Sequence, residues 1–184
     1  MSTVFARTVP SVRPPRPRRR AALSFTAVLL GAAVGCSAAD DAPRPEVPAP
    51  TGRQAALCRA LHKELPDEVG GLKRRATDPV SDFTAAWGEG PWIELRCGVP
   101  RPKIFNDVRT QAVDIDGVKW SPERLPDGSI RCTTPLRPVY VEVTLPKKVV
   151  GDGGDMSALV DLAAAVRKAV PSDDPDDSPA PKTP

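Results

Sequence analysis

Proline confines the part of the chain that can build a hydrophobic core. Of the 23 prolines in 184 residues, 13 lie in three segments, 1–35, 37–52 and 171–184. Proline lacks the backbone N–H that helix and sheet interiors use, so these segments are poor candidates for regular structure. The intervening 118 residues hold most of the aromatic residues and β-branched runs. We therefore predict one globular domain over 53–170, modest in size but able to bury a core.

The amino-terminal segment has the pattern of an export signal. Its only charged residues are six arginines between Arg7 and Arg20, and an apolar run of 14 residues follows at 21–34. At ~1.5 Å per residue this run makes about 21 Å of helix. A helix that spans a bilayer needs roughly 20 apolar residues, so the run fits the apolar region of a signal peptide better than a membrane span. We predict that residues 1–35 are a lipoprotein signal peptide.

The residues after the apolar run indicate lipidation. Ala33-Val34-Gly35 leads into Cys36, which resembles the bacterial lipobox except that Ala33 stands where leucine is usual. The resemblance implies cleavage before Cys36 and lasting attachment through lipid on that cysteine to the outer face of the cytoplasmic membrane. A secreted protein without lipid and an uncleaved anchor are the alternatives. Arg19-Arg20 also fits a twin-arginine signal loosely, so the export route stays open.

The two flanks of the predicted domain are polar. Residues 36–52 are predicted to be the lipidated cysteine and a proline-rich tether, up to about 50 Å long if fully extended. Residues 171–184 carry four aspartates and are predicted to be a disordered acidic tail. Without residues 1–35 the chain has 20 basic and 23 acidic residues. This balance argues against nucleic acid as a partner.

Hydrophobic periodicity within 53–170 predicts an α+β fold. Apolar residues at helical spacing predict a helix at 53–65 and another at 156–170, the second capped by Asp155. Alternating patterns predict strands at 93–99 and 139–145, and Asp116-Gly117 predicts a hairpin between 112–115 and 118–120. A turn at Pro126-Asp127-Gly128 leads into a further strand at 129–134. We expect a small antiparallel sheet, a meander, covered on one face by the two helices.

Three cysteines remain in the predicted domain, which allows one disulfide and one leftover thiol. Cys58 lies on the apolar face of the predicted helix and Cys97 on the apolar face of a predicted strand, so we favour the pair Cys58–Cys97. Cys132 is then a small buried residue or an unpaired thiol. The other two pairings stay open, and a 97–132 linkage would overturn the preferred one.

No motif predicts a catalytic residue, a metal or a cofactor. His62 follows Cys58 by four residues, but we expect it at the edge of a solvated helix face rather than in a nucleophile pair. Residues 151–155 are expected to form a flexible loop before a helix cap, and a cation site is the alternative. Lys73-Arg74-Arg75 reads as a solvated strand end, with contact to lipid headgroups or an anionic wall polymer as the alternative.

Three tryptophans complete the candidate residues. Trp87, Trp92 and Trp120 are expected to be packing anchors, and the alternative is a platform on which sugar rings stack.

Several segments of the domain resemble one known family. They are Cys58 with Leu61 and Leu65-Pro66, Ala85-Ala86-Trp87-Gly88, Leu95-Arg96-Cys97-Gly98-Val99-Pro100-Arg101-Pro102, Asp116 to Trp120, and Val139 to Val143. Together they resemble an actinobacterial lipoprotein family catalogued as domain of unknown function 3515. The resemblance implies a small extracytoplasmic lipoprotein in which Cys58 and Cys97 match the family's two cysteines, whereas Cys132 departs from the pattern. It implies no activity, cofactor or partner.

The sequence therefore predicts a membrane-anchored extracytoplasmic domain that binds or supports an envelope protein or wall polymer without catalysis. A module that binds solutes or wall polymer through exposed tryptophans is one alternative, and an envelope hydrolase with an unrecognised site is another. Asp114, Asp116 and His62 are the residues to replace in a test for catalysis. The oligomeric state cannot be inferred.

Overall fold

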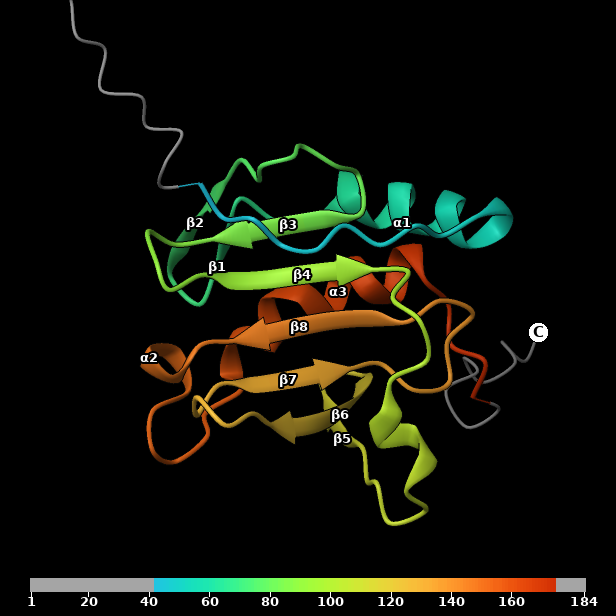
Figure 1. Cartoon of the computed structure of the whole chain (residues 1–184). Coiled ribbons are helices and arrows are strands. Elements are labelled where there is room, and N and C mark those ends of the chain that lie inside the picture. The colour runs from blue at the N-terminus through green and yellow to red at the C-terminus, as the bar shows by residue number, and fades with distance from the viewer. Residues whose placement is uncertain (1–41, 175–184) are drawn as a thin grey trace, which may run out of the picture. The chain divides into compact units, whose positions relative to one another are not determined.

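The computed structural model describes residues 42–174, and these form an α+β domain (Figure 1). Eight strands make one antiparallel sheet: β1 (Glu68–Val69), β2 (Leu72–Arg75), β3 (Thr84–Trp87), β4 (Ile93–Cys97), β5 (Val113–Ile115), β6 (Val118–Arg124), β7 (Ile130–Thr133) and β8 (Val141–Leu145). The helices are α1 (Gly52–Glu64), α2 (Lys147–Val150) and α3 (Val160–Ala169), with short 3₁₀ turns η2 (Lys103–Asn106) and η3 (Ser157–Leu159). The predicted α+β class is confirmed.

The sheet is larger than predicted, and it is not a single meander. Its strand order is β1-β2-β3-β4-β8-β7-β6-β5. Each half is a four-stranded meander, and the halves meet where β4 pairs with β8, with Leu95 opposite Val143. After β4 the chain passes through η2 to the far edge and returns strand by strand to the centre. The expected small meander was wrong because the β4–β8 pairing joins distant segments, which local patterns do not encode.

The central strands separate an apolar from a polar face. Successive side chains of a strand point to opposite faces, and β4 accordingly alternates between buried Ile93, Leu95 and Cys97 and half-buried Glu94 and Arg96. In β8 the buried residues Val141 and Val143 lie opposite Cys97 and Leu95 of β4, and buried Leu145 lies opposite Ile130 of β7. The apolar residues of both strands belong to one core cluster.

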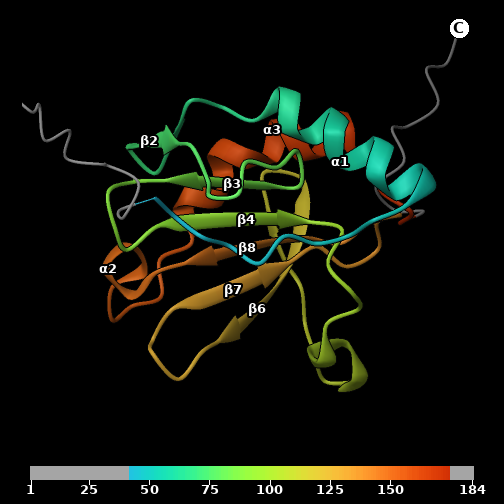
Figure 2. The same ribbon diagram turned by 45° about the horizontal axis from the view of Figure 1, so that its top comes forward.

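The two long helices contribute to this same core. From α1 the core takes Cys58 and Leu61, and from α3 it takes Leu162, Ala163 and Val166. Lys168 of α3 pairs with Glu64 of α1, with 2.7 Å between nitrogen and oxygen. Figure 1 shows α3 passing behind β4 and β8, and Figure 2, turned by 45°, shows α1 running beside α3. The two helices predicted from the sequence correspond in residue range to α1 and α3, although the α-helical part of the second starts only at Val160.

The predicted hairpin is present between β5 and β6. Asp116 and Gly117 form its turn with φ values of 49° and 73°. Both values are positive, as a type I′ turn requires. The Asp114 carboxylate accepts a hydrogen bond from the Gly117 amide at 3.0 Å, so this aspartate stabilises the turn.

Residues 42–51, here called the N-terminal segment, lie along the sheet before α1 begins. The Asp78 amide donates to the Pro43 carbonyl oxygen at 2.9 Å, and the Arg44 guanidinium pairs with the Asp78 carboxylate at 3.0 Å. Pro43 and Pro45 are buried. These residues fall within the predicted tether, 36–52, so the part of it that the structure describes packs against the domain instead of standing free.

At the other end of the domain the chain continues past α3 in contact with the fold. Val170 is fully buried, the Asp173 amide donates to the Leu136 carbonyl oxygen at 2.8 Å, and Asp174 is buried and paired with Lys119. The first four residues of the predicted tail, 171–174, are therefore held on the domain. Residues 175–184 lie outside the described residues.

Candidate functional site

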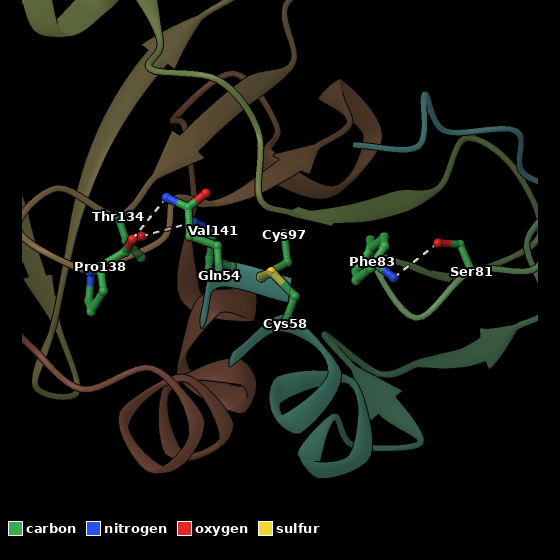
Figure 3. Close-up of a disulfide and its surroundings, with 8 residues drawn as sticks. All are labelled: Gln54, Cys58, Ser81, Phe83, Cys97, Thr134, Pro138 and Val141. Atoms are coloured by element: carbon green, nitrogen blue, oxygen red, sulfur yellow. Dashed lines mark hydrogen bonds between the residues drawn. A yellow bond between two sulfur atoms is a disulfide. The ribbon is translucent and has the colours of Figure 1, made fainter. Parts of the chain in front are cut away.

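A disulfide joins Cys58 of α1 to Cys97 of β4 (Figure 3). The preferred pairing is thus the one that the structure contains. Both cysteines are buried in the core, because each occupies an apolar position of its own element. The link connects residues 39 apart in sequence and ties the first helix to the central strand of the sheet.

Cys132 of β7 is a buried free thiol. Its Sγ lies 3.6 Å from the Met156 sulfur, and burial raises the pKa of the thiol to about 12. A thiolate, not a thiol, is the reactive nucleophile. Cys132 therefore acts as a small apolar core residue, one of the two roles predicted for it.

Three consecutive residues of β4 and the following loop make contacts to three different parts of the fold. Arg96 reaches across the polar face of the sheet, Cys97 is bonded to α1, and Gly98 lies beneath the N-terminal segment. A Cβ atom built on Gly98 would lie 2.6 Å from ring carbons of Pro50, so only glycine fits without a shift of the segment. Residues 96–98, which belong to one of the segments that resemble the known family, thus link β4 to three other parts of the fold.

The polar face carries a chain of alternating charges. Glu142, whose side chain is 5% exposed, accepts hydrogen bonds from two nitrogens of Arg96 at 2.9 and 2.7 Å. Arg96 also pairs with Glu46 of the N-terminal segment at 3.0 Å. On the other side of Glu142, Arg131 lies 3.8 Å away and pairs with Glu123 at 3.5 Å. Sequence patterns contain no signal for this network, because its five members come from five separate segments.

His62 is half-buried and bonded to a cation. Its Nε2 lies 3.1 Å from a guanidinium nitrogen of Arg74. Arginine can only donate, so Nε2 accepts and the ring is neutral. Burial, followed by the charge of Arg74, lowers the pKa of His62. Cys58, the proposed nucleophile partner, is in the disulfide, so the Cys–His pair considered above is absent.

The tryptophans do not form a sugar-binding platform. Trp87 and Trp120 are fully buried, and only Trp92 is partly exposed. The Trp87 indole N–H donates to the Pro66 carbonyl oxygen at 3.0 Å. Two of the three rings therefore anchor the core, as expected, and a platform that uses Trp87 and Trp120 is wrong because both rings are covered.

The acidic candidates have local structural partners. Asp116 pairs with Arg167 of α3 at 2.9 Å, and the Asp155 carboxylate accepts a hydrogen bond from the Ser157 amide at 2.8 Å. Asp155 thus binds the first amide of η3, but the predicted helix cap was wrong, because α3 starts only at Val160 and neither η3 nor α3 has a side-chain cap hydrogen bond. Within residues 42–174 no group of three or more histidine, cysteine or acidic side chains is placed to hold a metal ion.

One hollow on the described surface has a basic lining. It measures about 740 Å³ and lies between β2, the turn that joins β3 to β4, and α2. Its basic lining residues are Lys73, Arg74, Arg75 and Lys148, against one acid, Glu89, and Arg74 is also bonded to His62. The Arg75–Glu89 pair is long, at 3.8 Å, and Glu89 is 91% exposed. Glycines 70, 71, 88 and 90 also line the hollow and leave its wall free of side chains at those positions. We call this feature the basic hollow.

Cys36, the predicted lipidation site, lies outside the described residues, as does all of the predicted signal peptide. Among residues 42–174, none of the helices combines the length and the apolar character needed to cross a bilayer.

Comparison with known proteins supports the resemblance noted in the sequence. No curated protein and no solved structure matches the chain. A family model described as "Protein of unknown function (DUF3515)" matches residues 20–175, which include the whole described domain. The chain therefore belongs to this family of unknown function.

Proposed function

We propose that this chain is an exported lipoprotein, cut before Cys36 and held by lipid on the outer face of the cytoplasmic membrane. The observation that carries the proposal is the apolar run of 14 residues that ends beside Cys36. It is too short to span a bilayer and is preceded only by basic charge, which is the pattern of a cleaved signal. In this account the mature chain starts at the lipid anchor.

The Cys58–Cys97 disulfide supports the extracytoplasmic location. Structural disulfides persist outside the cytosol, whereas thiol-reducing systems inside the cell keep most cysteines reduced. Both cysteines lie in the core, where the bond is shielded from reductants.

The domain itself serves as a non-enzymatic module that binds or supports an envelope component. The side chains weighed as catalysts favour this assignment: His62 is neutral and bonded to Arg74, and Asp114 and Asp116 hold the β5–β6 turn and α3. These contacts engage His62 Nε2 and both carboxylates in holding the fold. Crosslinking the tethered protein on intact membranes identifies the envelope component.

Lipidation is tested by metabolic labelling with a fatty acid. The Cys36→Ser variant is expected to lose all incorporated label, because the thioether to the lipid needs the thiol. The matched control is Cys132→Ala, which removes the cysteine that lies outside both the disulfide and the predicted anchor, and it should keep full labelling. Label that persists in Cys36→Ser would refute the proposal.

A further inference from the structure

The packing of the N-terminal segment sets how far the domain can stand from its anchor. Pro43 is buried and hydrogen-bonded to the amide of Asp78, so the chain is fixed to the domain from this residue onward. Only seven peptide steps separate Cys36 from Pro43. A fully extended chain spans at most ~3.6 Å per residue, which limits this stretch to roughly 25 Å. The limit is about half of the length expected for the whole tether.

The chain enters the domain at the end that carries the basic hollow. Asp78, which binds Pro43 and Arg44, follows Arg75 of the hollow by three residues. Both ribbon views show the start of the described chain, in blue, at the end of the sheet formed by β2, the β3–β4 turn and α2 (Figures 1 and 2). These are the elements that line the hollow.

The positive charge of the hollow complements the surface of a membrane that contains anionic phospholipids. Lys73 and Lys148 are exposed, and Arg75 is only weakly engaged by the exposed Glu89 at 3.8 Å. Surface pairs at such distances contribute little, so Arg75 can exchange Glu89 for another anion. The chain after residue 35 has an excess of acids, which makes this concentration of basic groups at the anchored end distinctive.

We propose that the domain rests on its own membrane through the basic hollow, where Lys73, Arg75 and Lys148 bind the phosphate groups of anionic phospholipids. This inference rests on the lipid anchor proposed above. The short reach from Cys36 brings the hollow to the headgroup layer, and lysine and arginine side chains at that depth are attracted by the negative surface potential. Binding through the hollow fixes the orientation of the domain on the membrane. β2, which lines the hollow, lies near one edge of the sheet, and β5 forms the opposite edge.

The test uses the native lipidated protein reconstituted into vesicles of phosphatidylcholine alone or mixed with phosphatidylglycerol. A membrane-impermeant amine reagent modifies exposed lysines, and mass spectrometry gives the rate at each site. We expect Lys73 and Lys148 to react about fivefold more slowly on the anionic vesicles at low salt, and high salt should remove the difference. Lys63 of α1 and Lys103 of η2 are exposed and outside the hollow, so their rates should not change.

A pair of matched variants separates the hollow from general charge. In Lys73→Gln/Arg75→Gln, the protection of Lys148 should fall to the level seen with phosphatidylcholine alone. The control Lys63→Gln/Lys103→Gln removes the same charge elsewhere and should leave the protection of Lys148 intact.

The other outcomes overturn the inference in distinguishable ways. If neither vesicle type slowed the reaction of any of the four lysines on an anchored protein, the hollow would not contact the membrane. Because phosphatidylcholine also carries a phosphate but no net charge, equal protection on both vesicle types would show contact that does not depend on anionic lipid. Protection by soluble polyphosphate but not by vesicles would assign the hollow to another anion. A protein without acyl groups that stays in solution would refute the anchor itself, and this inference with it.

Discussion

Trp87 and Trp120 are both fully buried, yet their indole N–H groups differ. Trp87 donates to the Pro66 carbonyl oxygen, whereas Trp120 Nε1 has no hydrogen-bond partner among the described residues. Replacing a buried donor that has no partner is cheap, but removing one partner of a buried bond leaves the other unsatisfied. We expect Trp87→Phe to lower the free energy of unfolding by on the order of 1 kcal/mol more than Trp120→Phe.

Urea unfolding of the two variants measures this difference directly, since both lose the same volume. A larger loss in Trp120→Phe would mean that its N–H has a partner that this account omits.

Glu94 lies on the polar face of β4, opposite Thr144 of β8. Burial raises the pKa of Glu94, and the opposing charge of Arg96 offsets this only in part. A carboxyl with a raised folded-state pKa binds its proton more tightly in the folded state, so its ionisation costs stability as pH rises through that pKa. Glu94→Gln should therefore be more stable than the parent protein at pH 7.

The stabilisation should shrink when the pH falls below the ordinary carboxyl range, because Glu94 is then protonated in both states. Urea midpoints at neutral and acidic pH provide the measurement. The prediction is contradicted if Glu94→Gln stabilises the protein, relative to the parent, less at pH 7 than at acidic pH.

Single residues also show what the sequence could and could not reveal. Cys58 and Cys97 were predictable because each lies on the apolar face of a strongly periodic element. The network of Glu46, Arg96 and Glu142 could not be predicted, because a charged residue in an alternating strand is expected to face solvent whether or not it has a partner. Here Glu46 of the N-terminal segment and Glu142 of β8 are the partners of Arg96.

Among the elements, the disulfide between α1 and β4 makes the clearest contribution to stability. Closing a loop of about 40 residues restricts the unfolded chain by about 4 kcal/mol in the chain-entropy model. The variant Cys58→Ala/Cys97→Ala is expected to lose approximately that much free energy of unfolding, measured with denaturant. Cys132→Ala serves as the control, since it deletes a buried thiol without opening a loop. Equal losses in the two proteins would show that the link is not structural.

Strands were predictable where one face is exposed to solvent and the other is buried. β4 and β8 alternate, and the Asp116–Gly117 turn identified the β5–β6 hairpin. β3 escaped prediction because all four of its residues are buried, so they show no alternation, and two of them are alanines with low strand preference. β1 has two residues, too few to form a pattern.

At the scale of the whole molecule, the N-terminal segment changes the picture that composition suggested. Its prolines and charges are typical of a solvated spacer, yet Pro43 and Pro45 are buried and Glu46 pairs with Arg96. Composition describes how much surface a segment can bury by itself, not what an existing sheet offers it. If Cys36 carries the proposed anchor, this packing leaves only a short stretch of chain between the anchor and the domain.

The account depends on processing at Cys36, and the intact mass of the native protein purified from membranes tests it most directly. We predict a mass that lacks residues 1–35 and carries the added mass of acyl groups on the new amino-terminal cysteine. A mass that includes residues 1–35 without acyl groups would contradict the anchor, the location and the role at the membrane together.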